Sequence, residues 1–229
     1  MLAPVRTPWM AALLAGCQLG GARSFPPTEP ALEAENRQAG DPHGGRFPLA
    51  DALAGLPEGQ HLEAVIDTDA GVIFCALDLD VPLVVANFVG LARGLRPFQS
   101  QPGGPWETAP FYDGLEFHRA VPNQFIQTGR RGESEDPGFH LQDEMSSGHV
   151  FDRGGLLALA NTGEPHSGAA QFFITTGPLR HLDGKHTIFG TCDNEDVVRE
   201  LERRILDPAA RPQPATPPQL RTLKINRRP

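Results

Sequence analysis

Residues 117–129 have the sequence FHRAVPNQFIQTG, and this stretch decides the fold. Large apolar side chains stand in it beside a histidine, an arginine and two glutamines, in a run that favours β-strand. Successive side chains of a strand point to opposite faces of its sheet. We therefore expect the apolar side chains to enter a core, while Arg119 and Gln127 lie on an outer surface.

Short strand-like runs lie on both sides of this stretch. Leu62 to Leu77 alternates apolar and polar side chains around a turn at 67–71, which predicts a β-hairpin. Many short strands with few helices indicate a mainly β fold, a closed β-barrel with helices at its ends. The other strands are expected over residues 114–118, 124–128, 155–160, 171–175, 187–190 and 220–225.

Two helices are expected. The first covers residues 82–94, with Asp80 as its cap and Pro82 in its first turn. The second follows Asn194 and carries apolar side chains on one face, with Glu and Arg on the other. The Pro- and Gly-rich residues 95–110 are expected to form an exposed loop.

Composition excludes several classes of function. The net charge of -8, with no basic stripe, argues against nucleic acid as a partner. No apolar run is long enough to cross a bilayer as a helix. The eight histidines show no zinc-like spacing, so no metal is expected. Nothing in the sequence points to more than a monomer.

The first residues resemble a secretory signal peptide. Arg6 supplies a positive charge, an apolar stretch follows, and small residues then lead to Cys17. The run Leu14-Ala15-Gly16-Cys17 resembles the lipobox of bacterial lipoproteins, which predicts cleavage after residue 16 and lipidation of Cys17. In enterobacterial lipoproteins a residue such as Gln18 after the cysteine implies the outer membrane, facing the periplasm. The alternatives are a chance cysteine in an apolar tail and a soluble periplasmic or cytoplasmic protein.

The composition changes twice along the chain. Residues 17–60 are rich in Pro, Gly, Ala and charge, which predicts a flexible tether. One short helical turn is expected within 47–56. The globular domain is expected over residues 61–229.

Several separate blocks then carry a family resemblance. Residues 155–190, GLLALANTGEPHSGAAQFFITTGPLRHLDGKHTIFG, together with FHR at 117–119 and Gln127, strongly resemble the cyclophilin family of peptidyl-prolyl isomerases. ANFVGLARG and PFYDGLEFHR match that family as well. The resemblance implies a closed eight-stranded antiparallel β-barrel capped by two α-helices. It also implies catalysis of X-Pro bond isomerisation during the folding of exported proteins, without a cofactor.

The implied mechanism is electrostatic. Twisting an X-Pro bond breaks amide resonance against a barrier of ~18–20 kcal/mol. In the twisted state the proline nitrogen regains a lone pair, which a fixed guanidinium stabilises, and by resemblance Arg119 is that catalytic group. The resemblance makes Phe173 the floor of a proline slot, Gln127 the partner of a substrate carbonyl, and Ala160 and Asn161 the partners of the substrate backbone. The slot walls are implied to be Phe125, Leu182 and His186.

Other interpretations stay open. Arg119 could be a surface arginine in a salt bridge, and either Phe172 or Phe173 must face the core because adjacent strand residues point in opposite directions. The whole domain could bind proline-containing peptides and unfolded proteins as a chaperone with negligible turnover. Cys75 and Cys192 could pair, although buried free thiols are the simpler interpretation.

Some positions depart from the family pattern. Gln124 stands where many cyclophilins have Phe, and Phe125 where they usually have Met. Thr128 stands where they have Gly, which is expected to add a β-branched side chain beside the site. His181 replaces the Trp of cyclosporin-sensitive members, so weak cyclosporin binding is expected. The loop 162–167 is about one residue longer than in the eukaryotic type.

Overall fold

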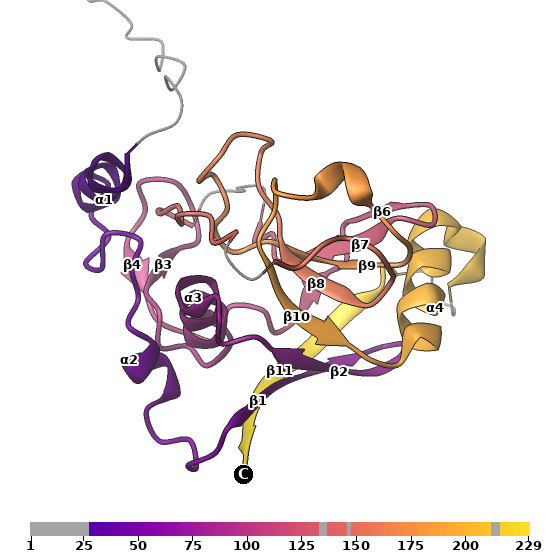
Figure 1. Cartoon of the computed structure of the whole chain (residues 1–229). Helices are drawn as coiled ribbons and strands as arrows, with labels where there is room; N and C mark the ends of the chain where they lie inside the picture. Colours follow the sequence, from indigo (N-terminus) through magenta and orange to yellow (C-terminus); the bar gives the residue numbers. More distant parts are fainter. Residues whose placement is uncertain (1–27, 133–136, 146–147, 212–215) are drawn as a thin grey trace, which may run out of the picture.

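The computed structural model describes residues 28–132, 137–145, 148–211 and 216–229. A nine-stranded antiparallel sheet forms its centre, in the order β5-β11-β1-β2-β10-β8-β9-β7-β6 (Figure 1). A two-stranded ribbon, β3–β4, lies outside it. The strands are β1 His61–Thr68, β2 Gly71–Leu77, β3 Phe98–Gln99, β4 Trp106–Glu107, β5 Leu115–Glu116, β6 Arg119–Val121, β7 Phe125–Thr128, β8 Leu156–Leu159, β9 Phe172–Thr175, β10 Ile188–Cys192 and β11 Gln219–Arg228.

The sheet curls until its two edge strands approach each other. The edges are β5 and β6, and in the chain only Phe117 and His118 separate them. The Thr128 hydroxyl of β7 donates to the Glu116 carbonyl oxygen of β5 at 2.8 Å, and so links the β5 edge to the strand next to the β6 edge. The expected mainly β architecture is confirmed, with nine strands instead of eight.

The helices lie around this sheet. In Figure 1, α3 and α4 stand at opposite ends of the strand region. Helix α3 is buried along almost its whole length, and α4 turns Val198 and Leu201 inward, which confirms both expected helices. The helical segments are α1 Glu29–Gln38, α2 Leu49–Leu53, α3 Pro82–Ala92, α4 Glu195–Leu206 and the 3-10 turns η1 Arg180–Leu182 and η2 Pro208–Ala210. No helix in the described ranges is long and apolar enough to cross a membrane.

The expected N-cap residue of helix α3 is wrong. Val81, not Asp80, occupies the N-cap position of α3 and provides no side-chain hydrogen bond. The Glu144 carboxylate accepts instead from the backbone N–H groups of Leu83 and Val84, at 3.1 and 2.8 Å. A carboxylate stabilises the free N–H groups of a helix N-terminus in the same way whether it is local or distant. Asn194 does occupy the N-cap position of α4, but its side chain donates to the Val72 carbonyl.

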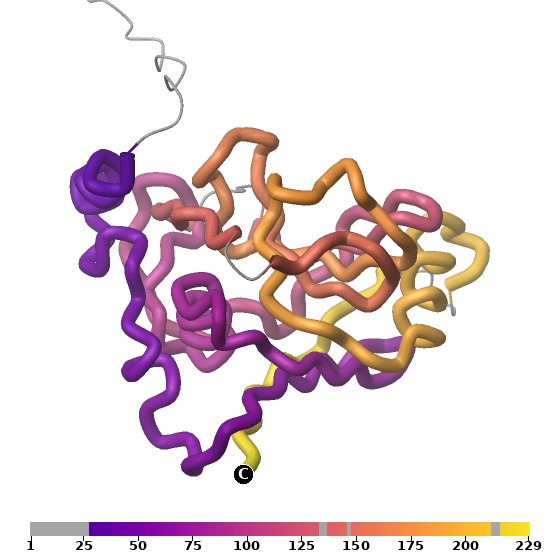
Figure 2. Tube along the Cα trace, in the orientation of Figure 1, coloured from indigo at the N-terminus to yellow at the C-terminus, as the bar shows by residue number. Residues whose placement is uncertain are grey.

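The expected flexible tether is wrong for the part of it that the structure describes. Residues 28–56 run along one side of the domain, where Figure 2 draws them as an indigo tube. Phe47 and Ala52 join the main core. The Asp41 and Arg96 side chains are both 0% exposed, with two contacts of 2.7 Å between carboxylate and guanidinium. A buried, paired charge fixes the segment in place, which composition alone does not reveal.

The same ion pair corrects the start of the expected exposed loop at 95–110, whose later residues 101–110 are exposed or half-buried as expected. Arg96 and Phe98 are fully buried there, and Gln99 is nearly so. The short helical turn expected within 47–56 is confirmed as α2. The predicted signal peptide, residues 1–16, and the predicted lipidation site, Cys17, lie outside the described residues.

The two remaining cysteines are joined. Cys75 of β2 and Cys192 of β10 are register partners on adjacent strands and form a disulfide bond across 117 residues of sequence. The free-thiol interpretation is therefore wrong. The bond links the expected N-terminal hairpin to the strand that precedes α4.

Candidate active site

One row of side chains crosses four strands of the curled sheet. Arg119 of β6 is the register partner of Gln127 on β7, and Gln127 is the partner of Phe173 on β9. Phe173 in turn pairs with Ala158 on β8. Register partners point to the same face of a sheet, so Arg119, Gln127 and Phe173 share one surface.

This surface forms the base of a cavity of about 390 Å³. All eight residues that the sequence assigned to catalysis and substrate binding line it. The lining is completed by Gln124 and His181 and by three residues that sequence reasoning did not assign, Val121, Thr162 and Gly163. The full lining is Arg119, Val121, Gln124, Phe125, Gln127, Ala160, Asn161, Thr162, Gly163, Phe173, His181, Leu182 and His186.

The floor of the cavity is aromatic. The Phe173 ring lies 5.2 Å from the Phe125 ring and 5.3 Å from the His186 ring, centroid to centroid. Behind it, Phe151 stacks on Phe173 at 5.8 Å. Phe172 points the other way and packs in the main core with Phe88 and Tyr112. The alternation expected for these adjacent phenylalanines is thus confirmed, with Phe173 facing the cavity.

The polar groups form a hydrogen-bonded chain above this floor. Arg119 donates to the Gln127 side-chain oxygen at 3.1 Å, and the Gln127 amide nitrogen donates to Gln171 at 2.8 Å. The guanidinium also lies 5.0 Å from the centre of the Phe125 ring. Within the described part of the chain no carboxylate pairs with Arg119, so the salt-bridge interpretation has no support there. The guanidinium is instead oriented by an amide and an aromatic ring.

His186 forms a neutral wall. Its Nδ1 lies 3.0 Å from the Leu159 carbonyl oxygen, so Nδ1 carries the hydrogen. Burial, the largest influence, lowers the pKa of His186. A neutral imidazole and two phenylalanines make this side of the cavity suitable for an apolar ring.

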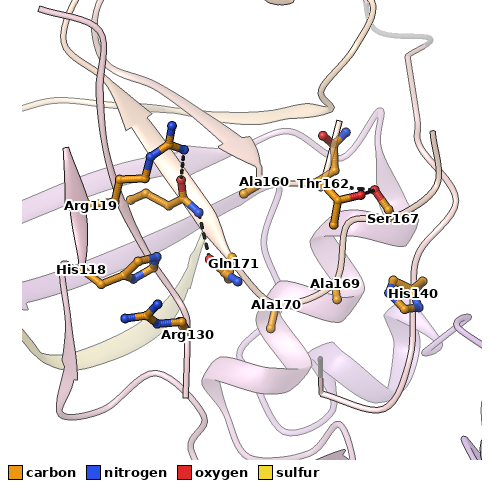
Figure 3. A pocket seen from close by; sticks show the side chains of 12 residues that line it. His118, Arg119, Arg130, His140, Ala160, Thr162, Ser167, Ala169, Ala170 and Gln171 are labelled. Carbon is orange, nitrogen blue, oxygen red and sulfur yellow. Dashed lines mark hydrogen bonds between the residues drawn. The ribbon is translucent and has the colours of Figure 1, made fainter. Parts of the chain in front are cut away.

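A second cavity, of about 480 Å³, continues from the first. The two share Arg119, Gln127, Ala160, Asn161 and Thr162. Figure 3 shows it between a wall with His118, Arg119 and Arg130 and an opposite wall with Thr162, Ser167 and His140. Together the cavities form a groove with Arg119 and Gln127 in the middle.

Sequence reasoning missed most of this second cavity. Gln171 had a usable signal, because it lies two residues before Phe173 and so shares its face. His140 had none, since irregular backbone and long-range packing bring it to the groove. Arg130 lies two residues after the end of β7 and is exposed.

The positions that depart from the family pattern take different places. Gln124 and His181 line the 390 Å³ cavity. Thr128 points away from it and is fully buried, bonded to the Glu116 carbonyl. The expectation that Thr128 adds bulk beside the site is therefore wrong, because β7 alternates and places it on the core face.

No metal cluster is present among the residues with described positions: no group of three or more His, Cys, Asp or Glu side chains could hold an ion. The side chains of the groove offer three kinds of chemical group. These are a fixed cation, amide donors and acceptors, and an apolar floor.

Comparisons with known proteins agree with this geometry. Residues 64–224 match the family model described as "Cyclophilin type peptidyl-prolyl cis-trans isomerase/CLD". The chain is 40% identical to the probable peptidyl-prolyl cis-trans isomerase A of Mycobacterium leprae, over 67% of this chain and 87% of that protein. It is 37% identical to the peptidyl-prolyl cis-trans isomerase B of Streptomyces anulatus, over 71% and 89%.

A solved structure is similar as well. The cyclophilin-type peptidyl-prolyl cis-trans isomerase of Cryptosporidium parvum aligns with a TM-score of 0.59 at 25% identity, covering 74% of this chain and 100% of that one. A second structure of it, described as in the presence of the dipeptide Ala-Pro, aligns with a TM-score of 0.57 at 22% identity, covering 72% and 99%.

Proposed function

The chain belongs to the cyclophilin-type peptidyl-prolyl cis-trans isomerase family and is such an isomerase, and from this premise we propose that the groove around Arg119 is where the X-Pro bond rotates. The observation that carries the proposal is the position of Arg119. Its guanidinium is fixed by Gln127 beside an aromatic floor and meets no described carboxylate that would neutralise it.

The proline ring would lie on Phe173, against Phe125, Leu182 and His186. There the twisted amide presents its nitrogen lone pair to Arg119, which stays charged at any relevant pH. An interaction that is stronger in the twisted state than in either planar isomer lowers the barrier without a covalent step. One such preorganised donor is worth ~3–4 kcal/mol of transition-state stabilisation.

The residues beside the proline would extend along the groove. The Gln127 amide nitrogen carries two hydrogens, and Gln171 accepts one of them. The other is available for a substrate carbonyl. The Asn161 side chain donates to the Lys185 carbonyl and the Ala160 N–H donates to the Gln171 carbonyl, both at 2.9 Å. The Ala160 carbonyl and the Asn161 backbone would therefore bind the substrate backbone. The Ala-Pro dipeptide named with the Cryptosporidium parvum structure supports proline-containing peptides as ligands.

A protease-coupled cis/trans assay on the full chain tests the assignment. Turnover of a short Ala-Pro-Phe peptide is expected to collapse in Arg119→Ala. Arg153→Ala is the matched control, because the Arg153 side chain is 57% exposed, pairs with Asp152 and lines neither cavity. Equal turnover in wild type and Arg119→Ala would remove Arg119 from the mechanism. A folded wild type without turnover would indicate a proline-segment binding module instead.

We also propose that the enzyme works in a bacterial cell envelope on exported proteins. The support is the signal-like residues 1–16, the lipobox ending at Cys17, and the disulfide bond between Cys75 and Cys192, which persists in oxidising compartments. Lipidation at Cys17 would anchor the enzyme as a monomer, with residues 18–27 linking the anchor to α1. The proposed place is the outer membrane, facing the periplasm.

Membrane fractionation tests the anchor. The native chain is expected in the detergent-soluble fraction, with a mass increase at Cys17 that matches a diacylglycerol. Cys17→Ser is expected in the soluble periplasmic fraction. A wild-type chain without lipid at Cys17 would contradict the anchor and leave a soluble enzyme.

A further inference from the structure

The N-terminal segment, residues 28–48, precedes the part of the chain that matches the family model, yet it is built into the domain. Asp41 accepts from Arg96 and from the backbone N–H groups of His43 and Gly45, the last at 2.6 Å. Leu32 and Phe47, which precede and follow Asp41 in the sequence, are also buried. The segment is therefore held by a buried charge pair, by hydrogen bonds and by buried apolar side chains.

The segment holds a neighbouring stretch, residues 137–145, which we call the strap. Asn36 and His140 form a reciprocal pair: the Asn36 amide nitrogen donates to the His140 carbonyl, and the His140 N–H donates to the Asn36 side-chain oxygen, both at 2.9 Å. The Arg96 guanidinium lies 3.9 Å from the centre of the Phe139 ring. Arg46 adds a hydrogen bond to Gln142 at 3.2 Å.

Little space separates Gly45 from the Asn36 side chain and the His140 backbone. A Cβ atom on Gly45 would lie 2.4 Å from the Asn36 amide nitrogen and 2.6 Å from the His140 carbonyl oxygen. Such distances leave no room for either group to shift toward Gly45. The backbone of His140 is thus seated against the segment, while His140 itself lines the 480 Å³ cavity.

The other side of the strap holds the loop that lines both cavities, residues 161–167. The Leu141 N–H donates to the Gly168 carbonyl at 2.8 Å. Asp143 and His166 form a second reciprocal pair: the Asp143 N–H donates to His166 Nδ1 at 3.0 Å, and the His166 N–H donates to the Asp143 carboxylate at 2.7 Å. Through this loop the strap reaches Thr162 and Ser167 in the groove.

We propose that the N-terminal segment is a positioning element of the isomerase groove. In this proposal Asn36 is a positioning residue that fixes the shape of the 480 Å³ cavity through His140 and the strap. The inference rests on the proposed function, because that cavity is where residues beside the proline would bind. Asn36 lines neither cavity, so it acts only through the strap. The aromatic rings of the 390 Å³ cavity that would hold the proline ring are Phe125, Phe173 and His186, none of which belongs to the strap. The strap reaches this cavity through the loop 161–167, which lines both cavities.

The position of Asn36 predicts that its replacement weakens the binding of long peptides but not the turnover of short ones. Asn36→Ala in the full chain removes both hydrogen bonds to the His140 backbone. We expect KM and Kd for a long alanine-based peptide with a central proline to rise ~3- to 10-fold, as is typical for coupling through packed networks. The kcat for that peptide, and kcat/KM for a short Ala-Pro substrate, are expected to stay within about twofold.

Two further variants keep the test decisive. Arg46→Ala removes an exposed contact to the strap without touching the core, and its effect is expected in the same direction but smaller. Glu33→Ala is the control, because Glu33 lies near the strap but its polar contact is with Arg37 of the same helix, and no described hydrogen bond or ion pair joins it to the strap. Circular dichroism establishes that each variant is folded.

The outcomes separate the inference from the proposed function. An unchanged long-peptide affinity in folded Asn36→Ala and Arg46→Ala would overturn the inference, as would an equal loss for long and short peptides. Absence of turnover in the wild type would overturn the proposed function. Calorimetric Kd values for the long peptide would still test the inference in that case, because they require no turnover.

Discussion

Replacement of Asp41 by alanine tests whether the N-terminal segment is part of the domain. The substitution leaves the Arg96 guanidinium buried without its carboxylate, and it removes the acceptor of two backbone N–H groups. Removal of one partner of a buried ion pair costs about 3–5 kcal/mol. For a domain of this size that corresponds to a fall in Tm of ~6–20 °C.

The assay is thermal and urea denaturation of the full chain, followed by circular dichroism. Asp152→Ala is the matched control, because the Asp152–Arg153 pair is solvent-exposed and such pairs contribute at most about 1 kcal/mol. A loss below about 1 kcal/mol for Asp41→Ala would refute the reasoning. The segment would then be a tether after all.

The effect of Asp41→Ala depends on pH with a defined sign. Burial alone would raise the pKa of Asp41, but hydrogen bonds and charge from Arg96 outweigh it and hold the pKa below its usual value of 3.8. A lowered carboxyl pKa stabilises the folded state above the unfolded pKa, and that stabilisation is lost as pH falls through the folded pKa. The difference in stability between wild type and Asp41→Ala is therefore expected in full at pH 7 and to shrink only below about pH 4.

Three further predictions concern the fold and the cavity. Replacing both Cys75 and Cys192 by alanine is expected to lower the free energy of unfolding by about 2–5 kcal/mol, because the disulfide bond closes a loop of 117 residues. Denaturation with and without reductant measures this loss, and a wild-type stability that does not change with reductant would contradict the bond. Glu144→Ala is expected to lower the free energy of unfolding by ~1–2 kcal/mol through loss of the α3 cap, while Asp80→Ala leaves it unchanged. In urea denaturation, a larger loss for Asp80→Ala than for Glu144→Ala would show that Asp80 is the cap. Cyclosporin is expected to bind weakly because His181, an exposed lining residue, stands where sensitive family members have Trp; His181→Trp is expected to tighten binding in a competition assay, and a nanomolar inhibition constant for the wild type would contradict the prediction.

The groove was predictable because its residues obey strand periodicity. Alternation in QFFI assigns one phenylalanine to the core and one to the surface, and the family resemblance selects Phe173. The same period places Arg119 and Gln127 on one face, where the register pairs them. Strand periodicity and the family resemblance together therefore predicted eight residues of the 390 Å³ cavity, but not Val121, Thr162 or Gly163.

The parts that were mispredicted depend on partners distant in the sequence. The buried Asp41 pairs with Arg96, which lies 55 residues later in the sequence. Helix α3 is capped by Glu144, which lies 60 residues after Val84. A polar, Pro- and Gly-rich composition predicts disorder because it lacks apolar surface, but it does not show a specific buried ion pair. The pairing of Cys75 with Cys192 likewise follows from adjacent strands that the sequence does not place side by side. Lipidation of Cys17 stays a prediction.

The central claim is that Arg119 stabilises the twisted X-Pro bond. NMR exchange spectroscopy on an Ala-Pro peptide at equilibrium tests it most directly, because it reports turnover and peptide binding in one sample without a coupling protease. The predicted result for Arg119→Ala is a fall in kcat of ~10²–10³-fold, equivalent to the loss of one preorganised donor, with Kd changed by only a few-fold. A folded Arg119→Ala that retains kcat within about tenfold of the wild type, or that loses activity only through weaker binding, would contradict it.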